Sequence, residues 1–291
     1  LIQVNNLLNM GKISSRKHLA IEVSDMVTNS GAIKSAGGLH LSTTELGNSG
    51  ILNARDLMAI DANQVENSNT IYSKQIMDIA ASSIINNGNL VGLSNTVLNS
   101  DELTNSGYIA SGTNLSVQTN SYLMNSGAIK TNNDITLIAT TLENSGAIKA
   151  GATLDINADT FASSGQQSSD EATSIVVNTY QNSGDVRANG QLTIFATSVN
   201  QSGRVIGSDT ATIDSQTFTN TGTIAIQGDV TQTHTTLENS GAINAGAGLA
   251  INADTMISSG QQTSGKATSI VANTYQNSGA LSANGQLTIR A

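Results

Sequence analysis

The chain has 291 residues and a formal net charge of −9, with 3% aromatic and 11% charged residues and no Pro, Cys or Trp. The acidic balance and the scattered Lys and Arg residues exclude the concentrated positive charge that nucleic-acid and anionic-membrane surfaces need. No stretch reaches the roughly eighteen consecutive apolar residues of a membrane-spanning helix. We therefore expect no nucleic-acid partner and no membrane insertion of this segment.

One unit recurs along the whole chain and is clearest at 142–158, which reads LENSGAIKAGATLDINA. The alternation of Leu154 and Ile156 indicates a strand. Asn144 and Gly146 indicate a turn, because Asn hydrogen-bonds its local backbone and Gly reaches positive φ without steric cost. A unit this short buries little surface by itself, so it must stack on copies of itself.

In chain order, the glycine of this turn recurs every 19 residues, with two steps of 20. The column comprises Gly11, Gly31, Gly50, Asn69, Gly88, Gly107, Gly127, Gly146, Gly165, Gly184, Gly203, Gly222, Gly241, Gly260 and Gly279. The one exception is Asn69, and Asn is the commonest non-glycine residue in the left-handed region. The column therefore predicts a backbone requirement at the turn.

Three further columns keep the same period and predict the core. Residues four before the glycine are apolar or aromatic from Leu7 to Tyr275. Residues two after it are aliphatic except Gln167 and Gln262, and residues ten after it are aliphatic except Gln232. Side chains that repeat at one position of every unit stack into continuous ladders when the units stack.

A unit of 19 residues is too short for a helix, a strand and their connections, and its β-branched residues favour strands. A left-handed hexapeptide β-helix would need a six-residue period, which is absent. The sequence therefore predicts an all-β parallel β-helix of about fifteen coils, with two or three strands per coil. We expect residues 1–291 to form a single continuous domain.

The asparagines two residues before the glycine predict an amide ladder along the turn. The structural turn positions of this kind are Asn29, Gly31, Asn48, Gly50, Asn105, Gly107, Asn125, Gly127, Asn144, Gly146, Asn182, Gly184, Asn239, Gly241, Asn277 and Gly279.

A longer repeat overlies the short one, because residues 142–196 and 237–291 match at 42 of 55 positions. Both copies carry the segment SSGQQ, in which Gln167 or Gln262 replaces an inward aliphatic residue. An unpartnered buried amide costs about 1–3 kcal/mol, so we expect a bulge or a loosened strand there. The segment is interpreted as tolerated architecture, with a specific contact surface as the alternative.

Residues that carry chemistry are few. His18, His40 and His234 occupy different columns, so we expect them to face solvent rather than to bind a metal. Asp170 and Glu171 belong to the densest acidic group but become Gly265 and Lys266 in the second copy. That change indicates solvated surface rather than a catalytic pair, and the sequence predicts neither enzymatic activity nor a cofactor.

Basic residues three positions after the glycine are the remaining candidates for ligand binding. We expect four of them to lie on one outward face, where they would suit an anionic ligand such as a glycan sulfate or a lipopolysaccharide phosphate. These residues are Lys34, Lys130, Lys149 and Arg187.

The pattern LxNSGxIxAxxxLxIxA, present at 142–158 and 237–253, resembles the filamentous-haemagglutinin repeat of two-partner-secretion exoproteins. These include adhesins, haemolysins and effectors of contact-dependent growth inhibition in Gram-negative bacteria. The resemblance implies a right-handed parallel β-helix that is exported through an outer-membrane transporter and is secreted or displayed at the cell surface.

The resemblance and the uniform coils together predict a structural stalk that presents a distal binding or toxin module. A direct adhesive module that binds a glycan or an outer-membrane receptor is the alternative, and a carbohydrate-active β-helix enzyme is the third hypothesis. Because the pattern continues to both ends of the sequence, we expect the chain to be a segment of a longer protein, with capping coils outside it.

Overall fold

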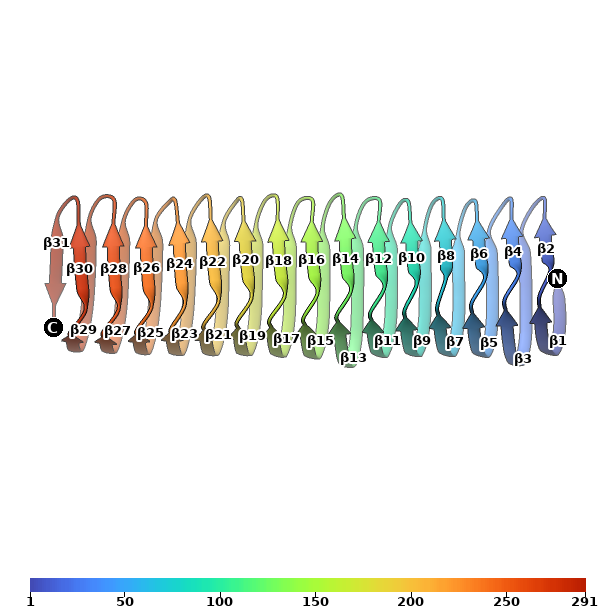
Figure 1. Ribbon diagram of the computed structural model, residues 1–291, viewed down its shortest axis with the longest axis horizontal. Coiled ribbons are helices and arrows are strands. Elements are labelled where there is room, and N and C mark those ends of the chain that lie inside the picture. Colours follow the sequence, from blue (N-terminus) through green and yellow to red (C-terminus); the bar gives the residue numbers. More distant parts are fainter. The chain divides into compact units, whose positions relative to one another are not determined.

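The computed structural model describes residues 1–291 and contains only β-strands and turns, as the sequence predicts (Figure 1). It has no helix, and therefore none that could span a membrane. The chain divides into two compact units, here called unit 1 (1–142 and 146–151) and unit 2 (143–145 and 152–291). The single continuous domain stays a prediction, and the two units are described separately.

In unit 1, long and short strands alternate along the chain. The long strands are β1 (Ile2–Asn9), β3 (Leu19–Asn29), β5 (Leu39–Asn48), β7 (Met58–Asn67), β9 (Met77–Asn86), β11 (Thr96–Asn105), β13 (Leu115–Asn125) and β15 (Ile135–Asn144), the last two residues of which belong to unit 2. The short strands are β2 (Lys12–Ser15), β4 (Ala32–Ser35), β6 (Ile51–Ala54), β8 (Thr70–Ser73), β10 (Asn89–Gly92), β12 (Tyr108–Ser111), β14 (Ala128–Thr131) and β16 (Ala147–Ala150).

Unit 2 repeats the alternation. Its long strands are β17 (Leu154–Ser163), β19 (Thr173–Asn182), β21 (Leu192–Gln201), β23 (Ala211–Asn220), β25 (Val230–Asn239), β27 (Leu249–Ser258), β29 (Thr268–Asn277) and β31 (Leu287–Arg290). Its short strands are β18 (Gln166–Ser169), β20 (Asp185–Ala188), β22 (Arg204–Gly207), β24 (Thr223–Ile226), β26 (Ala242–Ala245), β28 (Gln261–Ser264) and β30 (Ala280–Ala283).

Each coil of the β-solenoid therefore contains two strands, and like strands pair in parallel. Leu39 of β5 lies opposite Met58 of β7, one unit of 19 residues further along the chain. Long strands form one sheet of each unit and short strands the other. Along β2, β3 and β4 in Figure 1 the chain winds in the right-handed sense, as is usual for parallel strands joined by a crossover.

The three predicted columns are confirmed as the core of both units. Ile33, Leu41 and Leu46, one from each column, are at most 1% exposed. Two further inward columns on the long strands, eight and twelve residues after the turn glycine, also line the core. Two consecutive outward residues, such as Thr44 and Glu45, then interrupt the alternation. Before this pair the odd-numbered residues of β5 face inward, and after it the even-numbered residues do. The long strand therefore bends around the core.

The extra residue of each 20-residue step lies in this bend. The register shifts by one residue between Val23 and Met26 of β3 and between Thr119 and Tyr122 of β13. The inward columns on both sides of the bend stay in line because an outward residue absorbs the insertion.

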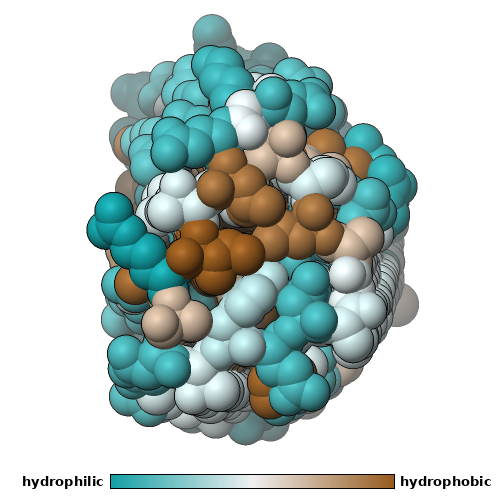
Figure 2. Space-filling view, turned by 90° about the vertical axis from the view of Figure 1, so that its left-hand side faces the viewer, coloured by the Kyte–Doolittle hydropathy of each residue, from teal (hydrophilic) through white to brown (hydrophobic).

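At one end of unit 2, core residues are open to solvent. Leu287 and Ile289 of β31 are 46% and 41% exposed, and Figure 2 shows an apolar patch surrounded by polar side chains at this end.

Candidate functional site

The turn glycines are required by close approach between coils rather than by a left-handed backbone. No residue in the structure has positive φ, so that part of the interpretation was wrong. A Cβ atom on Gly50 would instead lie 2.1 Å from the backbone oxygen of Gly31, and one on Gly31 would lie 2.1 Å from the oxygen of Gly11. Gly11, with no coil before it, has open space at the same point.

Asn69 occupies this crowded position with an altered hydrogen-bond pattern. Its side-chain Nδ2 donates to the backbone oxygen of Ser49 at 3.1 Å. The following N–H, of Thr70, donates to Gly50 O at 3.2 Å, against 2.9 Å for the equivalent bond from Ile51 to Gly31. The turn therefore accommodates a Cβ by shifting slightly away from the preceding coil.

The predicted amide ladder is present in unit 1. Each Asn Nδ2 donates to Oδ1 of the next Asn at 2.7–2.8 Å, through Asn9, Asn29, Asn48, Asn67, Asn86, Asn105 and Asn125. The Nδ2 groups also bond backbone oxygens, for example Asn86 to Tyr108 O at 3.2 Å. All seven side chains are buried. The ladder fixes the turns of successive coils to one another.

In unit 2 other residues interrupt the ladder. Ser163, Gln201 and Ser258 stand at the Asn position. Asn182 donates to Gln201 Oε1 at 2.8 Å, but Gln201 Nε2 and Asn220 Oδ1 are buried without a partner. The ladder resumes from Asn220 to Asn239 at 2.8 Å.

The two SSGQQ segments keep the regular strand–turn–strand pattern of the other coils, so the predicted bulge was wrong. β18 pairs with β20, and β28 pairs with β26 and β30, without a register shift. Gln167 Nε2 donates to Ser163 Oγ, and Gln262 Nε2 donates to Ser258 Oγ. The buried glutamine is tolerated because a serine replaces the ladder asparagine in the same coil and bonds the glutamine amide.

A second group of buried polar side chains lies on β25. Gln232 and His234 are at most 5% exposed, so the prediction that His234 faces solvent was wrong, whereas His18 and His40 are exposed as expected. His234 Nδ1 lies 2.9 Å from Ser215 Oγ, and its ring stacks on Phe218 with centroids 4.8 Å apart.

The remaining polar atoms of this group have no partner. They are both amide atoms of Gln232 and Nε2 of His234. Burial lowers the pKa of His234 to about 4, although a hydrogen bond with the Ser215 backbone offsets part of that fall. The imidazole is therefore neutral near pH 7.

The four basic candidates are exposed, but only two of them are neighbours. Lys130 of β14 pairs directly with Lys149 of β16. Lys34 lies between Ser14 and Asn53, and Arg187 lies between Ser168 and Ile206 with Asp185 at 3.8 Å. Two ammonium groups on adjacent strands can attract one anionic group, so only the Lys130–Lys149 pair has the geometry of a candidate site.

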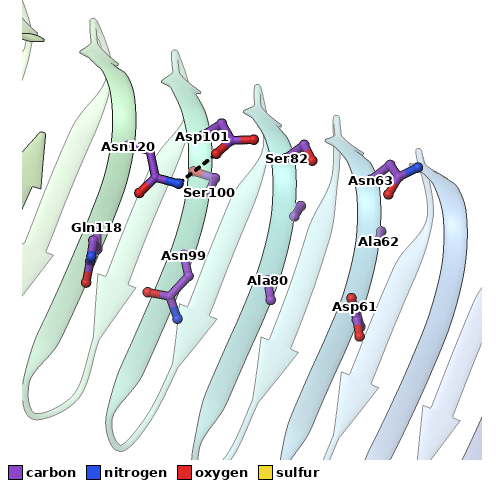
Figure 3. Close-up of a pocket in the computed structure, with 11 residues that line it drawn as sticks. Asp61, Ala62, Asn63, Ala80, Ser82, Asn99, Ser100, Asp101, Gln118 and Asn120 are labelled. Carbon is purple, nitrogen blue, oxygen red and sulfur yellow. Dashed lines mark hydrogen bonds between the residues drawn. The ribbon is translucent and has the colours of Figure 1, made fainter. Parts of the chain in front are cut away.

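A shallow groove of about 480 Å³ crosses the outer face of the long strands β7, β9, β11 and β13 (Figure 3). Small residues such as Ala80 form its floor, between Asp61 and Asn63 on one side and Asp101 on the other. Asp101 accepts a hydrogen bond from Asn120 Nδ2 at 2.7 Å. The groove can accept hydrogen bonds and attract cations.

Sequence analysis missed this groove because its residues are 19 or 20 apart. The period itself carried the signal, since Asp61, Ala80, Asn99 and Gln118 share one column. In the described structure no group of three or more His, Cys, Asp or Glu side chains could hold a metal ion.

Comparison with known proteins identifies the repeat. The haemagglutinin repeat family matches residues 2–107, 109–194, 172–234 and 205–291. No curated protein and no solved structure gives a significant match.

Proposed function

Because the chain belongs to the haemagglutinin repeat family, we propose that it is a structural stalk in a secreted or surface-displayed bacterial filament. In this role it holds a distal binding or toxin module away from the cell and performs no catalysis itself. An outer-membrane transporter of the two-partner-secretion type exports it. Its partners during export and at the cell surface are proteins or glycans, not nucleic acid.

The regular pairing of the coils is the observation that supports this proposal. In both units, nearly every long strand meets the next at a constant offset, with inward positions of constant character and outward positions that vary. A part whose useful property is its length needs this kind of uniformity, since each coil adds about 4.8 Å. The copying of residues 142–196 at 237–291 is in keeping with growth by whole coils.

An in-frame deletion tests the stalk. Removing residues 142–236 joins Thr141 to Leu237 and takes out five whole coils. We expect the shortened chain to fold with an unchanged far-ultraviolet circular dichroism per residue, and the gene product that carries it to be exported and to keep its distal activity.

The matched control removes residues 142–231 and therefore puts the columns out of register. We expect this control to lose cooperative unfolding and export. If both deletions fail, the coils are not interchangeable spacers and the proposal is wrong.

The Lys130–Lys149 pair favours a second candidate, an adhesive module that binds an anionic glycan or an outer-membrane receptor. Saturable binding of the purified chain to target cells that is lost in Lys130→Glu/Lys149→Glu, but not in Lys34→Glu/Arg187→Glu, would support adhesion. A stalk shows no such binding.

A further inference from the structure

Unit 1 sorts its charged residues between its two sheets. Eight basic residues lie on short strands or on the turns that follow them, against two acidic residues there, Asp56 and Asp134. All eight are exposed, and they are Lys12, Arg16, Lys17, Lys34, Arg55, Lys74, Lys130 and Lys149. This surface is called the basic face.

The long strands of unit 1 carry the opposite charge. They hold eight exposed acidic residues and no Lys or Arg, so they form an acidic face. These residues are Glu22, Asp25, Glu45, Asp61, Glu66, Asp78, Asp101 and Glu102. The groove of Figure 3 lies on this face, with Asp61 and Asp101 among its lining residues.

The two faces lie on different sides of the coil. Figure 1 shows the short strands of unit 1 in front, whereas the long strands start behind them and bend forward below them. Every long strand from β3 to β11 carries an acidic residue, and each of the coils with β2, β4, β6 and β8 carries a basic one. Both faces therefore present charge at the coil spacing of about 4.8 Å.

Charges on the basic face are not neutralised within the chain. Lys34, Arg55 and Lys74 have no carboxylate within ion-pair distance, and the ion pair that the structure shows is Arg187–Asp185 in unit 2. Ion pairs within the chain therefore do not account for the sorting of charge between the two sheets. A partner outside the chain, with the opposite charge repeated at the same spacing, would account for it.

Unit 2 has the same fold without the sorting. Its short strands and following turns carry three basic and five acidic residues, and its long strands carry one basic and six acidic residues. The segregation in unit 1 is therefore not a by-product of the coil, in which outward positions accept either sign.

We propose that the basic face of unit 1 binds the acidic face of unit 1 in a second copy of this chain. A second copy offers the opposite charge at the same axial spacing, so several pairs come into register together. Because the contact joins two different surfaces, each bound copy leaves one face free, and the association continues laterally. This self-association is independent of the proposed stalk function.

Salt dependence follows from the exposure of these charges. Single exposed pairs contribute little and are screened by salt, so the contact needs many pairs and low ionic strength. The Debye length falls from about 30 Å at 0.01 M salt to about 3 Å at 1 M. We expect sedimentation velocity of the 291-residue chain to show association at the lower salt concentration and a monomer at the higher one.

Two triple variants separate the effect of the basic face on association from the effect of the net charge of the chain. Lys34→Glu/Arg55→Glu/Lys74→Glu changes the basic face, and Arg187→Glu/Arg204→Glu/Lys266→Glu makes the same change of charge in unit 2. We expect the first to raise the concentration of half-association on the order of tenfold or more, and the second to change it less than about twofold. Circular dichroism confirms that both variants are folded.

A complementation experiment tests which faces meet. Glu45→Lys/Asp61→Lys/Glu66→Lys reverses the acidic face, and we expect it to lose self-association alone but to regain association when mixed with the basic-face variant. The proposal is overturned if the wild type is a monomer at low salt, or if both triple variants with added Glu residues weaken association equally. A monomer that binds a sulfated polysaccharide through the basic face would also overturn it, and would assign that face to a glycan.

Discussion

The turns of unit 1 and unit 2 solve one packing problem in different ways. Unit 1 uses the same residue, Asn, at seven successive coils, and each amide satisfies the next. Unit 2 replaces it with Ser163, Gln201 and Ser258 and compensates in two of these coils with a buried glutamine. The difference shows that the fold does not require asparagine itself at this turn, and that it tolerates two unpartnered buried atoms there, Gln201 Nε2 and Asn220 Oδ1.

The core shows the same contrast. The inward column twelve residues after the glycine holds small residues such as Ala62 and Ser100 in unit 1 but includes His234 in unit 2. Phe161 also stacks on Tyr180 in unit 2, with ring centroids 5.2 Å apart. Unit 2 thus contains larger core groups. Its unpartnered buried atoms include amide and imidazole atoms of Gln201, Gln232 and His234, whereas those of unit 1 are the hydroxyls of Thr96, Ser100 and Thr119. We expect its coils to be the less stable ones.

The largest expected effect comes from breaking the ladder in the unit where it is complete. Asn86→Ala removes the acceptor of Asn67 and the donor to Asn105. It removes two ladder hydrogen bonds and leaves the buried Asn105 Oδ1 without its donor, whereas Asn67 Nδ2 keeps its bonds to backbone oxygens, so it should cost about 3–4 kcal/mol. Asn220→Ala removes one ladder bond, because Asn220 Oδ1 has no partner, and should cost about 2 kcal/mol. Hydrogen exchange of the adjoining strands measures both, and equal costs would contradict the comparison.

Acidification should weaken unit 2 through His234. Its pKa is lowered from 6.5 to about 4 in the folded chain, mainly by burial, so between these values the unfolded state binds the extra proton. Stability is therefore complete above about pH 6.5 and falls as the pH drops toward 4, by up to about 3 kcal/mol.

Variants of the histidines test the source of this pH dependence. We expect His234→Ala to flatten the dependence of hydrogen exchange in β23, β25 and β27 between pH 4 and 6.5. His40→Ala, which removes an exposed imidazole, should leave the dependence intact. A dependence that survives His234→Ala would assign it to other groups.

The fold was predictable from the sequence to the extent that one residue type fills a column. The period, the parallel stacking and the three aliphatic columns all follow from residues such as Ile33 and Leu41, which are apolar in nearly every coil. The column of His234 mixes Ala, Ser, Thr and Val, so its composition does not mark it as core. The alternation of side chains along the strand did indicate that His234 faces inward, because Gln232, two residues earlier, belongs to a core column.

Two other features depend on contacts between coils, which composition does not reveal. Gly50 is needed because the backbone of Gly31 lies against it, and a sequence cannot distinguish this reason from a left-handed turn. The charges of unit 1 look scattered in the sequence, since Lys34, Arg55 and Lys74 are about one coil apart. The repeat period combined with the sign of the charge could have found the basic face.

At the turn glycine, unit 1 is the less regular of the two units. Its column contains one residue other than Gly, Asn69, whereas the column of unit 2 contains only Gly. Gly50→Ala should cost about 2 kcal/mol, since the new Cβ would force the turn away from Gly31. Gly47→Ala is the matched control, because its Cβ would meet nothing nearer than 3.9 Å, and it should be neutral or slightly stabilising. Thermal unfolding compares the two, and equal effects would show that close approach is not the reason for the column.

The smallest expected effect is a coupling between Ser163 and Gln167, which tests whether unit 2 truly compensates for its missing asparagine. Gln167→Val alone removes the donor to Ser163 Oγ, and Ser163→Asn alone adds an amide beside the one already there. The double variant recreates the turn of unit 1, so its cost should be less than the sum of the single costs by about 1 kcal/mol.

The copied pair Ser258 and Gln262, which has the same contact, should give a coupling of the same sign. Additive effects at both sites would mean that the serine and the glutamine are tolerated separately. The similarity of the two segments would then be a product of duplication alone, and the turns of unit 2 would simply be weaker versions of those in unit 1.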